Sequence, residues 1–430
     1  MKKKSGKIVF YVIASIAAAL LIFYLVMRVI KTHESQYHLY IGGYGNNAVK
    51  CLFNSDNLEY GVLEDFKAKN PSYLALTPKG NRLYGVSESG STSGVWGYAN
   101  NFTQASLGEC ADGGLDPCHL ALYRGYIFTA NYGKGSISVF PLDTSGRIKA
   151  ASQVIQFVPS TTSRNAIADN ANNLNTGNSS TSNKAKDNKS VKATNSGRGA
   201  AGTIVPRIHM VKVLKMKQSE RNYLLATDKG SDRIYFFRIE QDTTATASAD
   251  NILGGKPLRL NRCDTAFLQV PKNYGPRHIE FSQDGRFMYL LCETSCKVIV
   301  YRMNEENGNI LLNPIQEIIS DRDVNEACAD IHLSPDGRFL YTSNRRGRDG
   351  ITIFHVNADG TLERIAYQVT AQYPRSFAFS PDGEFLFVCC QKDKIVQIFR
   401  TDRKSGYLIN TGKTITFTDL EPSCILVKEI

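Results

Sequence analysis

The chain has 430 residues, of which 42% are hydrophobic, and its formal net charge is +11 at pH 7. Residues 1–31 contribute +6 and residues 160–203 contribute +4, so the rest of the chain is close to neutral. A nucleic-acid-binding domain is expected to concentrate basic charge on its folded surface. This charge distribution therefore excludes nucleic acid as the expected partner.

The first predicted element is a membrane anchor. Residues 8–30 are apolar except for Arg28, and a helix needs about 20 such residues to cross a bilayer. A cleaved signal peptide is the alternative, but its apolar stretch is usually about 7–15 residues long. Four lysines within the first seven residues favour a cytoplasmic N-terminus. We expect a tail and single-pass anchor over residues 1–34, with residues 35–430 outside the cytoplasm (periplasmic, lumenal or extracellular).

A hairpin unit recurs along the rest of the chain. In its clearest copy, residues 276–301, a strand over residues 278–282 is followed by Gln283-Asp284-Gly285 and a second strand over residues 286–292. Asp-Gly between β-rich runs indicates a hairpin, because glycine accepts the positive φ of the turn. The unit returns as LSPDGRFLYTSN, FSPDGEFLFVCC and, more weakly, LTPKGNRLYGVS. One supersecondary unit repeated in this way predicts a repeat fold.

Seven segments open these repeats, and each leads into an apolar strand. They begin at Pro71, Pro117, Pro206, Pro276, Ala327, Pro374 and Pro422. The intervals are 46, 89, 70, 51, 47 and 48 residues, and without residues 160–203 the longest falls to 45. A period of about 40–50 residues is typical of a four-stranded propeller blade. We predict an all-β, seven-bladed β-propeller in which residues 422–427 complete a blade with residues 37–66, because this closure leaves no open edge.

Residues 160–203 differ from the repeats in composition. They are rich in Asn, Ser, Thr and Lys and have almost no large apolar residues. Such a segment cannot bury enough surface to offset its ordering entropy. We predict a disordered insertion, either inside the second blade or between the second and third.

The ten cysteines allow two interpretations. An exported domain could pair them as disulfides, or they could remain buried free thiols. Cys292 and Cys296 have a spacing used in zinc sites, but no second close Cys or His pair completes a four-ligand set. We therefore expect neither a metal nor a cofactor.

Propeller geometry predicts which residues share one face. The first strand of a blade lines the central channel and the second runs antiparallel to it, so the start of strand one lies beside the end of strand two. The position before each apolar triplet reads Tyr73, His119, His209, His278, Asp330, Ser376 and Cys424. The preceding position includes Arg277 and Arg375, and the ends of the second strands give Glu88, Asn131, Asp228, Glu293 and residues 344–346.

Histidines at these positions could simply cap inner strands. Their grouping with arginines and acids nevertheless indicates a concave site with convergent polar groups. The chain has no His-x-His or His-Glu-x-x-His pattern and no Gly-x-Ser-x-Gly elbow, which argues against metal and serine hydrolysis. What remains is proton transfer with cationic stabilisation of an anionic or carbonyl-containing small molecule.

Several segments resemble the lactonase-type seven-bladed propellers, which include bacterial 6-phosphogluconolactonases and fungal carboxymuconate cycloisomerases. The resemblance covers about residues 37–428 and rests on NPSYLALTPKGNRLYGVSE, DPCHLAL, GPRHIEFSQDGRFMYLL, LSPDGRFLYTSNRRGRDGITIFHV and YPRSFAFSPDGEFLFVCC. It implies a metal-independent site of one His, two Arg and one Glu. By motif position these are His209, Arg277, Glu293 and Arg345.

Two departures from the family pattern stand out. The family's opening Gly-Thr-Tyr-Thr is Gly42-Gly43-Tyr44-Gly45 here, and Arg207 replaces the first histidine of its Pro-His-x-His. The resemblance implies a lactonase-like hydrolase acting on a sugar-acid or other anionic lactone. A membrane-anchored binding or scaffold propeller without catalysis is the alternative, because one fold hosts many functions.

The expected site has two groups of residues. Either His209 or Glu293 acts as general base, while Arg277 and Arg345 bind the substrate's carboxylate or phosphate and the developing oxyanion. These four side chains should converge on one pocket. The residues expected to bind substrate are His119, His278, Arg375, Arg346 and Asn131.

Overall fold

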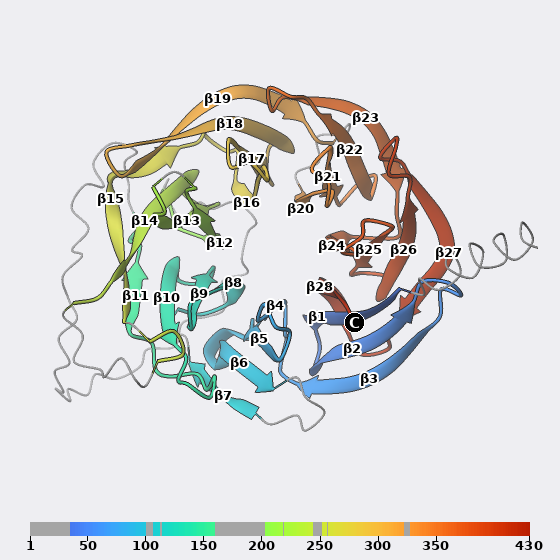
Figure 1. The fold of residues 1–430 in the computed structure, drawn as a ribbon, viewed down its shortest axis with the longest axis horizontal. Helices are drawn as coiled ribbons and strands as arrows, with labels where there is room; N and C mark the ends of the chain where they lie inside the picture. Colours follow the sequence, from blue (N-terminus) through green and yellow to red (C-terminus); the bar gives the residue numbers. More distant parts are fainter. Residues whose placement is uncertain are drawn as a thin grey trace, which may run out of the picture.

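The structure is a computed structural model that describes residues 35–99, 106–111, 114–159, 203–217, 219–243, 252–255, 257–321 and 327–430. Within these ranges the chain forms seven four-stranded sheets, each built from antiparallel neighbours. The sheets are arranged as blades in a ring, with their first strands toward the centre and their fourth strands at the rim (Figure 1). The predicted all-β seven-bladed propeller is confirmed.

The first three blades follow one another along the chain. Blade 1 has β4 (Tyr73–Leu76), β5 (Arg82–Ser87), β6 (Gly94–Ala99) and β7 (Ser106–Ala111), with one 3-10 turn, η1 (Gly90–Thr92). Blade 2 has β8 (Pro117–Tyr123), β9 (Tyr126–Asn131), β10 (Ser136–Pro141) and β11 (Gln153–Gln156). Blade 3 has β12 (Ile208–Lys215), β13 (Asn222–Asp228), β14 (Arg233–Gln241) and β15 (Leu258–Gln269).

The next three blades carry the clearest repeats. Blade 4 has β16 (Pro276–Phe281), β17 (Phe287–Cys292), β18 (Lys297–Glu306) and β19 (Asn309–Ile319). Blade 5 has β20 (Cys328–Leu333), β21 (Phe339–Asn344), β22 (Gly350–Val356) and β23 (Leu362–Val369). Blade 6 has β24 (Pro374–Phe379), β25 (Phe385–Cys390), β26 (Ile395–Thr401) and β27 (Leu408–Thr416).

Blade 7 closes the ring with both ends of the propeller. Its order is β28-β1-β2-β3, where β28 is Glu421–Glu429, β1 is Gln36–Tyr44, β2 is Asn47–Asn54 and β3 is Tyr60–Lys67. The red β28 therefore lies against the blue β1 in Figure 1. A bulge falls between Gly42 and Gly43, and a Cβ on Gly43 would collide with the backbone carbonyl of Glu421. This close approach explains why glycine stands where the family pattern has threonine.

The predicted hairpin turns also form. Gly285, Gly337 and Gly383 all have positive φ, at 76°, 73° and 74°. In the first of these turns, the Asp284 carboxylate accepts hydrogen bonds from the Ser282 hydroxyl and the Arg286 backbone N–H. Glycine supplies the left-handed residue and aspartate satisfies the turn backbone, as the Asp-Gly pattern requires.

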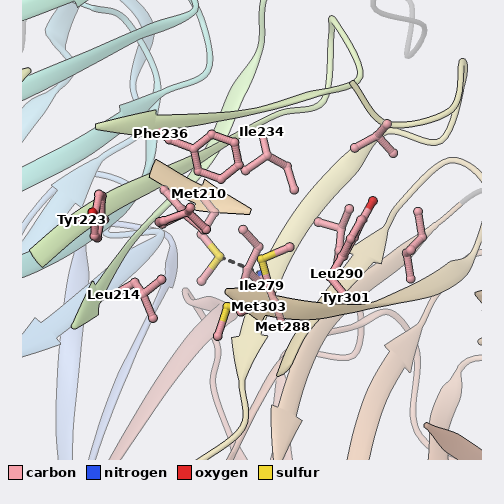
Figure 2. Close-up of a cluster of buried hydrophobic side chains, with 14 of the residues drawn as sticks. Met210, Leu214, Tyr223, Ile234, Phe236, Ile279, Met288, Leu290, Tyr301 and Met303 are labelled. Atoms are coloured by element: carbon pink, nitrogen blue, oxygen red, sulfur yellow. Dashed lines mark hydrogen bonds between the residues drawn. The ribbon is translucent and has the colours of Figure 1, made fainter. Parts of the chain in front are cut away.

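The hydrophobic core lies between neighbouring blades. Figure 2 shows the cluster between blades 3 and 4, where Met210 and Phe236 face Ile279, Met288 and Leu290. The Ile279 backbone N–H donates to the Met210 sulfur at 3.1 Å, drawn as a dashed line. Because this packing fixes β12 against β16, it also fixes the polar residues that precede Met210 and Ile279 on those strands.

Several predictions concern residues that the structure does not describe. The predicted anchor at residues 8–30 lies outside the described ranges, and no helix within those ranges is long and apolar enough to cross a membrane. Residues 160–202 of the insertion also lie outside them. Since β11 ends at Gln156 and β12 begins at Ile208, the insertion falls between blades 2 and 3.

All ten cysteines are described and all are free thiols.

Candidate active site

The starts of the first strands and the ends of the second strands meet at one end of the channel. They surround a cavity of about 200 Å³. Its lining comes from all blades, and consists of Tyr44, Glu88, Cys118, Tyr132, His209, Lys229, Arg277, Glu293, Arg345, Arg346, Tyr373 and Arg375. Five of these side chains are basic and two are acidic, so the cavity carries an excess of positive charge.

Glu293, the residue directly after β17, is the centre of the charge cluster. Its Oε2 accepts from Arg277 Nε at 3.0 Å, and its Oε1 accepts from Lys229 Nζ at 2.9 Å. Arg345 Nη2 lies 3.4 Å from the same Oε1. Three blades therefore each contribute a cation to one buried carboxylate.

This arrangement fixes the protonation state of Glu293. Burial by itself would raise the pKa of its carboxyl, but the positive charges of Lys229, Arg345 and Arg277 outweigh burial and hold the pKa well below its ordinary value. The carboxylate is therefore ionised at neutral pH, with both oxygens in ion pairs. Such a group orients cations well and accepts a proton poorly.

His209, the second residue of β12, lies in the cavity wall beside this cluster. Burial, followed by the positive charge of Arg277, holds its pKa well below the ordinary value, so the imidazole is neutral at pH 7. Its ring lies 5.7 Å from that of Tyr132 and 5.4 Å from that of His278. Among the described residues, its buried Nδ1 has no hydrogen-bond partner. A neutral imidazole in this position is a candidate general base.

The opposite wall carries a second hydrogen-bonded group. Arg375 Nη2 donates to the Tyr44 hydroxyl at 3.0 Å, and this hydroxyl donates to Glu88 Oε2 at 2.9 Å. Burial outweighs the effect of Arg375 and raises the pKa of Tyr44 above its ordinary value, so the phenol remains protonated. The guanidinium of Arg375 is thereby held at the cavity wall by a neutral hydroxyl.

The comparisons with known proteins agree with this geometry. Residues 38–427 match the family described as "Lactonase, 7-bladed beta-propeller". The chain belongs to this lactonase propeller family. A 6-phosphogluconolactonase of Formosa agariphila is 30% identical over 369 residues, covering 83% of this chain and 88% of the relative. A 6-phosphogluconolactonase of Bacillus subtilis is 24% identical over 398 residues, with coverages of 89% and 96%.

Solved structures of similar proteins share the whole propeller. A candidate 6-phosphogluconolactonase of Bacteroides fragilis superposes with a TM-score of 0.74 at 30% identity, covering 92% of this chain and 99% of its own. The periplasmic gluconolactonase PpgL of Pseudomonas aeruginosa gives a TM-score of 0.70 at 25% identity, covering 91% and 99%. The similarity to these relatives therefore extends across all blades.

Six of the nine site residues predicted for this lactonase propeller line the cavity. The four expected catalytic side chains, His209, Arg277, Glu293 and Arg345, converge there, as do Arg345's neighbour Arg346 and Arg375. Convergence on one pocket was the geometric condition for the enzymatic interpretation. The roles of these residues remain predictions.

The other three predicted residues do not line the cavity. Asn131 is fully buried at the end of β9, and its amide donates to the hydroxyls of Ser136 and Ser138. His119 and His278 lie in the channel wall outside the lining. His119 stacks on Tyr73 with ring centroids 4.0 Å apart. Substrate contact by these three residues stays a prediction.

Tyr132, the residue after Asn131, is the one that lines the cavity. The side chain that reaches the cavity is the one directly after the second strand: Glu88, Tyr132, Lys229, Glu293 and Arg345 follow β5, β9, β13, β17 and β21 in turn. In blade 3 the sequence pattern indicated Asp228, which is the last residue of β13. The next residue, Lys229, is the one that lines the cavity. Tyr132 and Lys229 stand at the same position of their repeats as Glu293 and Arg345, so an alignment of the repeats on those two residues identifies both.

Arg207, the departure from the family pattern, does not enter the cavity. Its guanidinium donates to the backbone carbonyls of Tyr132 and Gly133 and lies over the Tyr132 ring, 5.3 Å from the centroid. Arg207 therefore supports the cavity wall from behind. Within the described residues, no group of three or more His, Cys, Asp or Glu side chains is placed to hold a metal ion.

A larger cavity of about 450 Å³ lies among the later residues of the inner strands, away from this cluster. It is lined largely by apolar residues of β4, β24 and β28, including Leu76, Phe379 and Leu426, with His332 in one wall. It lacks the converging arginines and the carboxylate of the first cavity. The candidate active site is therefore the smaller, charged cavity around Glu293.

Proposed function

We propose that this protein is a metal-independent lactonase that hydrolyses a small anionic lactone of the sugar-acid type. The observation that carries the proposal is the cavity around Glu293, where three cations converge on one carboxylate beside a neutral histidine. A lactone ester needs a base to activate water and cations to stabilise the oxyanion. The cavity brings both requirements within one site.

His209 is the proposed general base. Glu293, the other candidate, has both oxygens in ion pairs and a strongly lowered pKa, which makes it a weak proton acceptor. His209 would take a proton from water as that water attacks the lactone carbonyl, and would return it to the ring oxygen when the C–O bond breaks. A bound anion would raise the pKa of His209 toward neutrality, because opposite charge favours the imidazolium.

The arginines divide into two groups. Arg277 and Arg345 flank Glu293 and would stabilise the negative charge that develops on the carbonyl oxygen. Arg346 and Arg375 also line the cavity. They would bind the carboxylate or phosphate arm of the substrate, since guanidinium groups suit both anions. Glu293 and Lys229 would hold the catalytic arginines in place.

The relatives support the class of reaction. Two of them are named 6-phosphogluconolactonases and a third is a gluconolactonase, so sugar-acid lactones are the first compounds to test. The finer proposal, that the substrate carries a negative charge, rests on the excess of basic over acidic groups in the cavity lining.

We also propose that the propeller acts outside the cytoplasm, attached by residues 8–30. The support is the apolar sequence preceded by lysines. Protease added to intact cells or sealed vesicles should digest an outward-facing propeller. Complete protection until the membrane is lysed would reverse the orientation.

The deciding experiment is a lactone panel assayed with the full chain, with and without chelator. We expect turnover of gluconolactone-type substrates, faster with an anionic arm and unchanged by chelator. His209→Gln should abolish turnover, whereas His355→Gln, on β22 away from the cavity lining, should not. Loss of activity with chelator would overturn the metal-free mechanism. No turnover of any lactone would instead favour a binding propeller.

A further inference from the structure

A chain of hydrogen-bonded polar groups continues from the cavity into the channel, with buried members near the cavity and partly exposed members at its far end. It starts at Arg277 and passes through side chains of β12, β16 and β20. Arg277 Nη1 lies 3.2 Å from His278 Nε2, and His278 Nδ1 lies 2.8 Å from Asp330 Oδ1. The other oxygen of Asp330 lies 3.3 Å from His332 Nε2. His332 Nδ1 then lies 3.3 Å from Glu280 Oε2, and Glu280 Oε1 accepts from Lys212 Nζ at 2.6 Å.

The chemistry of this chain determines the tautomer of His278. Burial, followed by the charge of Arg277, lowers the pKa of His278 to about 4, so its ring is neutral and carries one proton. The pKa of Asp330 lies well below its ordinary value although burial opposes this, because His332 and His278 favour the carboxylate. A carboxylate only accepts hydrogen bonds, so the proton must be on Nδ1.

The other ring nitrogen then faces Arg277 as a bare acceptor. Arg277 Nη1 can donate to His278 Nε2 only while that nitrogen carries no proton. The same Nη1 also donates to the Ala329 carbonyl, and Nε donates to Glu293. These three partners fix the plane of the guanidinium. The opposite tautomer of His278 would place two N–H groups against each other at this contact.

We propose that His278 and Asp330 are positioning residues for Arg277: Asp330 selects the Nδ1–H tautomer of His278, and His278 then orients the guanidinium toward the cavity. The function of Arg277 in this inference rests on the proposed lactonase activity. The orientation itself does not, and can be measured without a substrate. Neither positioning residue lines the cavity.

The lower part of the chain keeps Asp330 ionised. His332 donates to Asp330 and to Glu280, and Lys212 pairs with Glu280. The Ile331 backbone N–H donates to Asp330 as well. Two anions and two cations cancel here, so the quartet (Lys212, Glu280, Asp330 and His332) supports Asp330 without adding net charge beneath the cavity. The rings of His119 and His209 pack against His278 at 5.7 and 5.4 Å and limit its rotation.

The alternative is an ion network that only stabilises the fold. The tautomer of His278 and its effect on Arg277 distinguish this alternative from a positioning role. The test substitution is Asp330→Asn in the full chain, because an asparagine amide can donate to Nδ1 and release the proton to Nε2. Asp336→Asn, an exposed position in the turn of the same blade, is the matched control. Histidine ¹⁵N–¹H spectra, assigned with His278→Gln, report which nitrogen carries the proton.

We expect the wild-type protein and Asp336→Asn to show Nδ1–H, and Asp330→Asn to show Nε2–H. The Arg277 guanidinium signals should show slow rotation in the first two proteins and faster rotation in the third. With an active lactone, kcat should fall about 100-fold in Asp330→Asn, the size of effect that a misplaced catalytic group can cause, while KM changes little. His278→Gln, which retains an acceptor for Arg277, should keep more activity than His278→Leu.

Two results would overturn the inference. One is an Nε2–H tautomer in the wild-type protein. The other is an unchanged Arg277 rotation and kcat in a folded Asp330→Asn variant whose tautomer has reversed. If no lactone is turned over, the proposed function fails, but the tautomer and the guanidinium rotation still decide whether Asp330 and His278 position Arg277. If Asp330→Asn does not fold, the Arg277 guanidinium rotation in His278→Gln and His278→Leu decides it: faster rotation in His278→Leu than in His278→Gln supports the inference, and wild-type rotation in both overturns it.

Discussion

Two charge clusters lie in one channel, and they differ in the balance of positive and negative groups. Around Glu293, one carboxylate faces Lys229, Arg277 and Arg345, so positive charge is in excess. In the quartet below, Asp330 and Glu280 face His332 and Lys212, and the charges cancel. The charges of the quartet pair with one another, whereas the cluster around Glu293 has more positive than negative groups.

The difference suits two roles: the balanced quartet holds neighbouring side chains in place, and the positively charged cluster around Glu293 is the candidate active site. Desolvating a charge costs several kcal/mol unless partners compensate it. The excess of cations around Glu293 therefore carries a cost that an anion bound in the cavity would offset. We therefore expect substitutions around Glu293 to lower both stability and turnover. Substitutions in the quartet should change the orientation of Arg277 or the pH dependence of the free energy of unfolding.

The largest effect is expected from Glu293→Gln. Removing the carboxylate that Lys229, Arg277 and Arg345 share takes away a common partner of three buried or nearly buried cations. Breaking a buried pair costs about 3–5 kcal/mol, so the free energy of unfolding in urea should fall by this amount and turnover should be lost. Glu384→Gln, an exposed position in a blade 6 turn, is the control. Unchanged stability in Glu293→Gln would contradict the central place of this carboxylate.

Arg277→Ala should have the next largest effect, and it should fall on the rate. If Arg277 stabilises the oxyanion, its loss should lower kcat about 10²–10³-fold, as for other donors to a developing negative charge. Arg286→Ala removes an exposed arginine that pairs with Asp284 in the adjacent turn and should leave kcat unchanged. An equal loss in both variants would indicate a general disturbance of blade 4.

Arg375→Ala should act mainly on binding. Its guanidinium lines the cavity and is held by Tyr44, so it is placed to contact an anionic arm. A hydrogen bond to a charged group contributes about 1.5–3 kcal/mol, and KM for an anionic lactone should rise about 10- to 100-fold. KM for a neutral lactone should change little. The same increase for both lactones would refute the assignment of Arg375 to the anionic arm.

The smallest effect concerns the pH dependence of stability in the quartet. Burial alone would lower the pKa of His332, but Asp330 and Glu280 raise it to about 10. A group whose pKa is raised by folding stabilises fully below its ordinary pKa near 6.5 and loses this contribution as the pH rises toward 10. The free energy of unfolding should therefore decline between pH 6.5 and 10.

The variant His332→Gln should flatten this alkaline decline, measured by urea unfolding at pH 6, 8 and 9.5. On the acid side, Lys212 and His332 outweigh burial and lower the pKa of Glu280 to about 2. Its contribution is present above about pH 4.5 and is lost as the pH falls. Glu280→Gln should therefore reduce the acid-side loss. The same pH profile in His332→Gln as in the wild type would contradict the ion pairs of His332.

The sequence alone determined the blade count, the closure and most of the cavity. Asp-Gly turns recur because their backbone demands glycine and aspartate, so repeats such as residues 282–285 can be read without a structure. The seven opening segments then fixed the closure by residues 422–427. His209, Arg277, Glu293 and Arg345 followed from their positions in the repeat, together with the family resemblance.

Only the tertiary structure decided which side chains line the cavity. Asn131 and Tyr132 are neighbours at the end of a second strand, and successive strand residues point to opposite faces. A one-residue difference therefore separates a buried amide from a cavity wall. The pairing of His278 with Asp330 joins β16 to β20 across two blades. No local pattern specifies such a contact, because it depends on how the packed blades bring distant strands together around the channel.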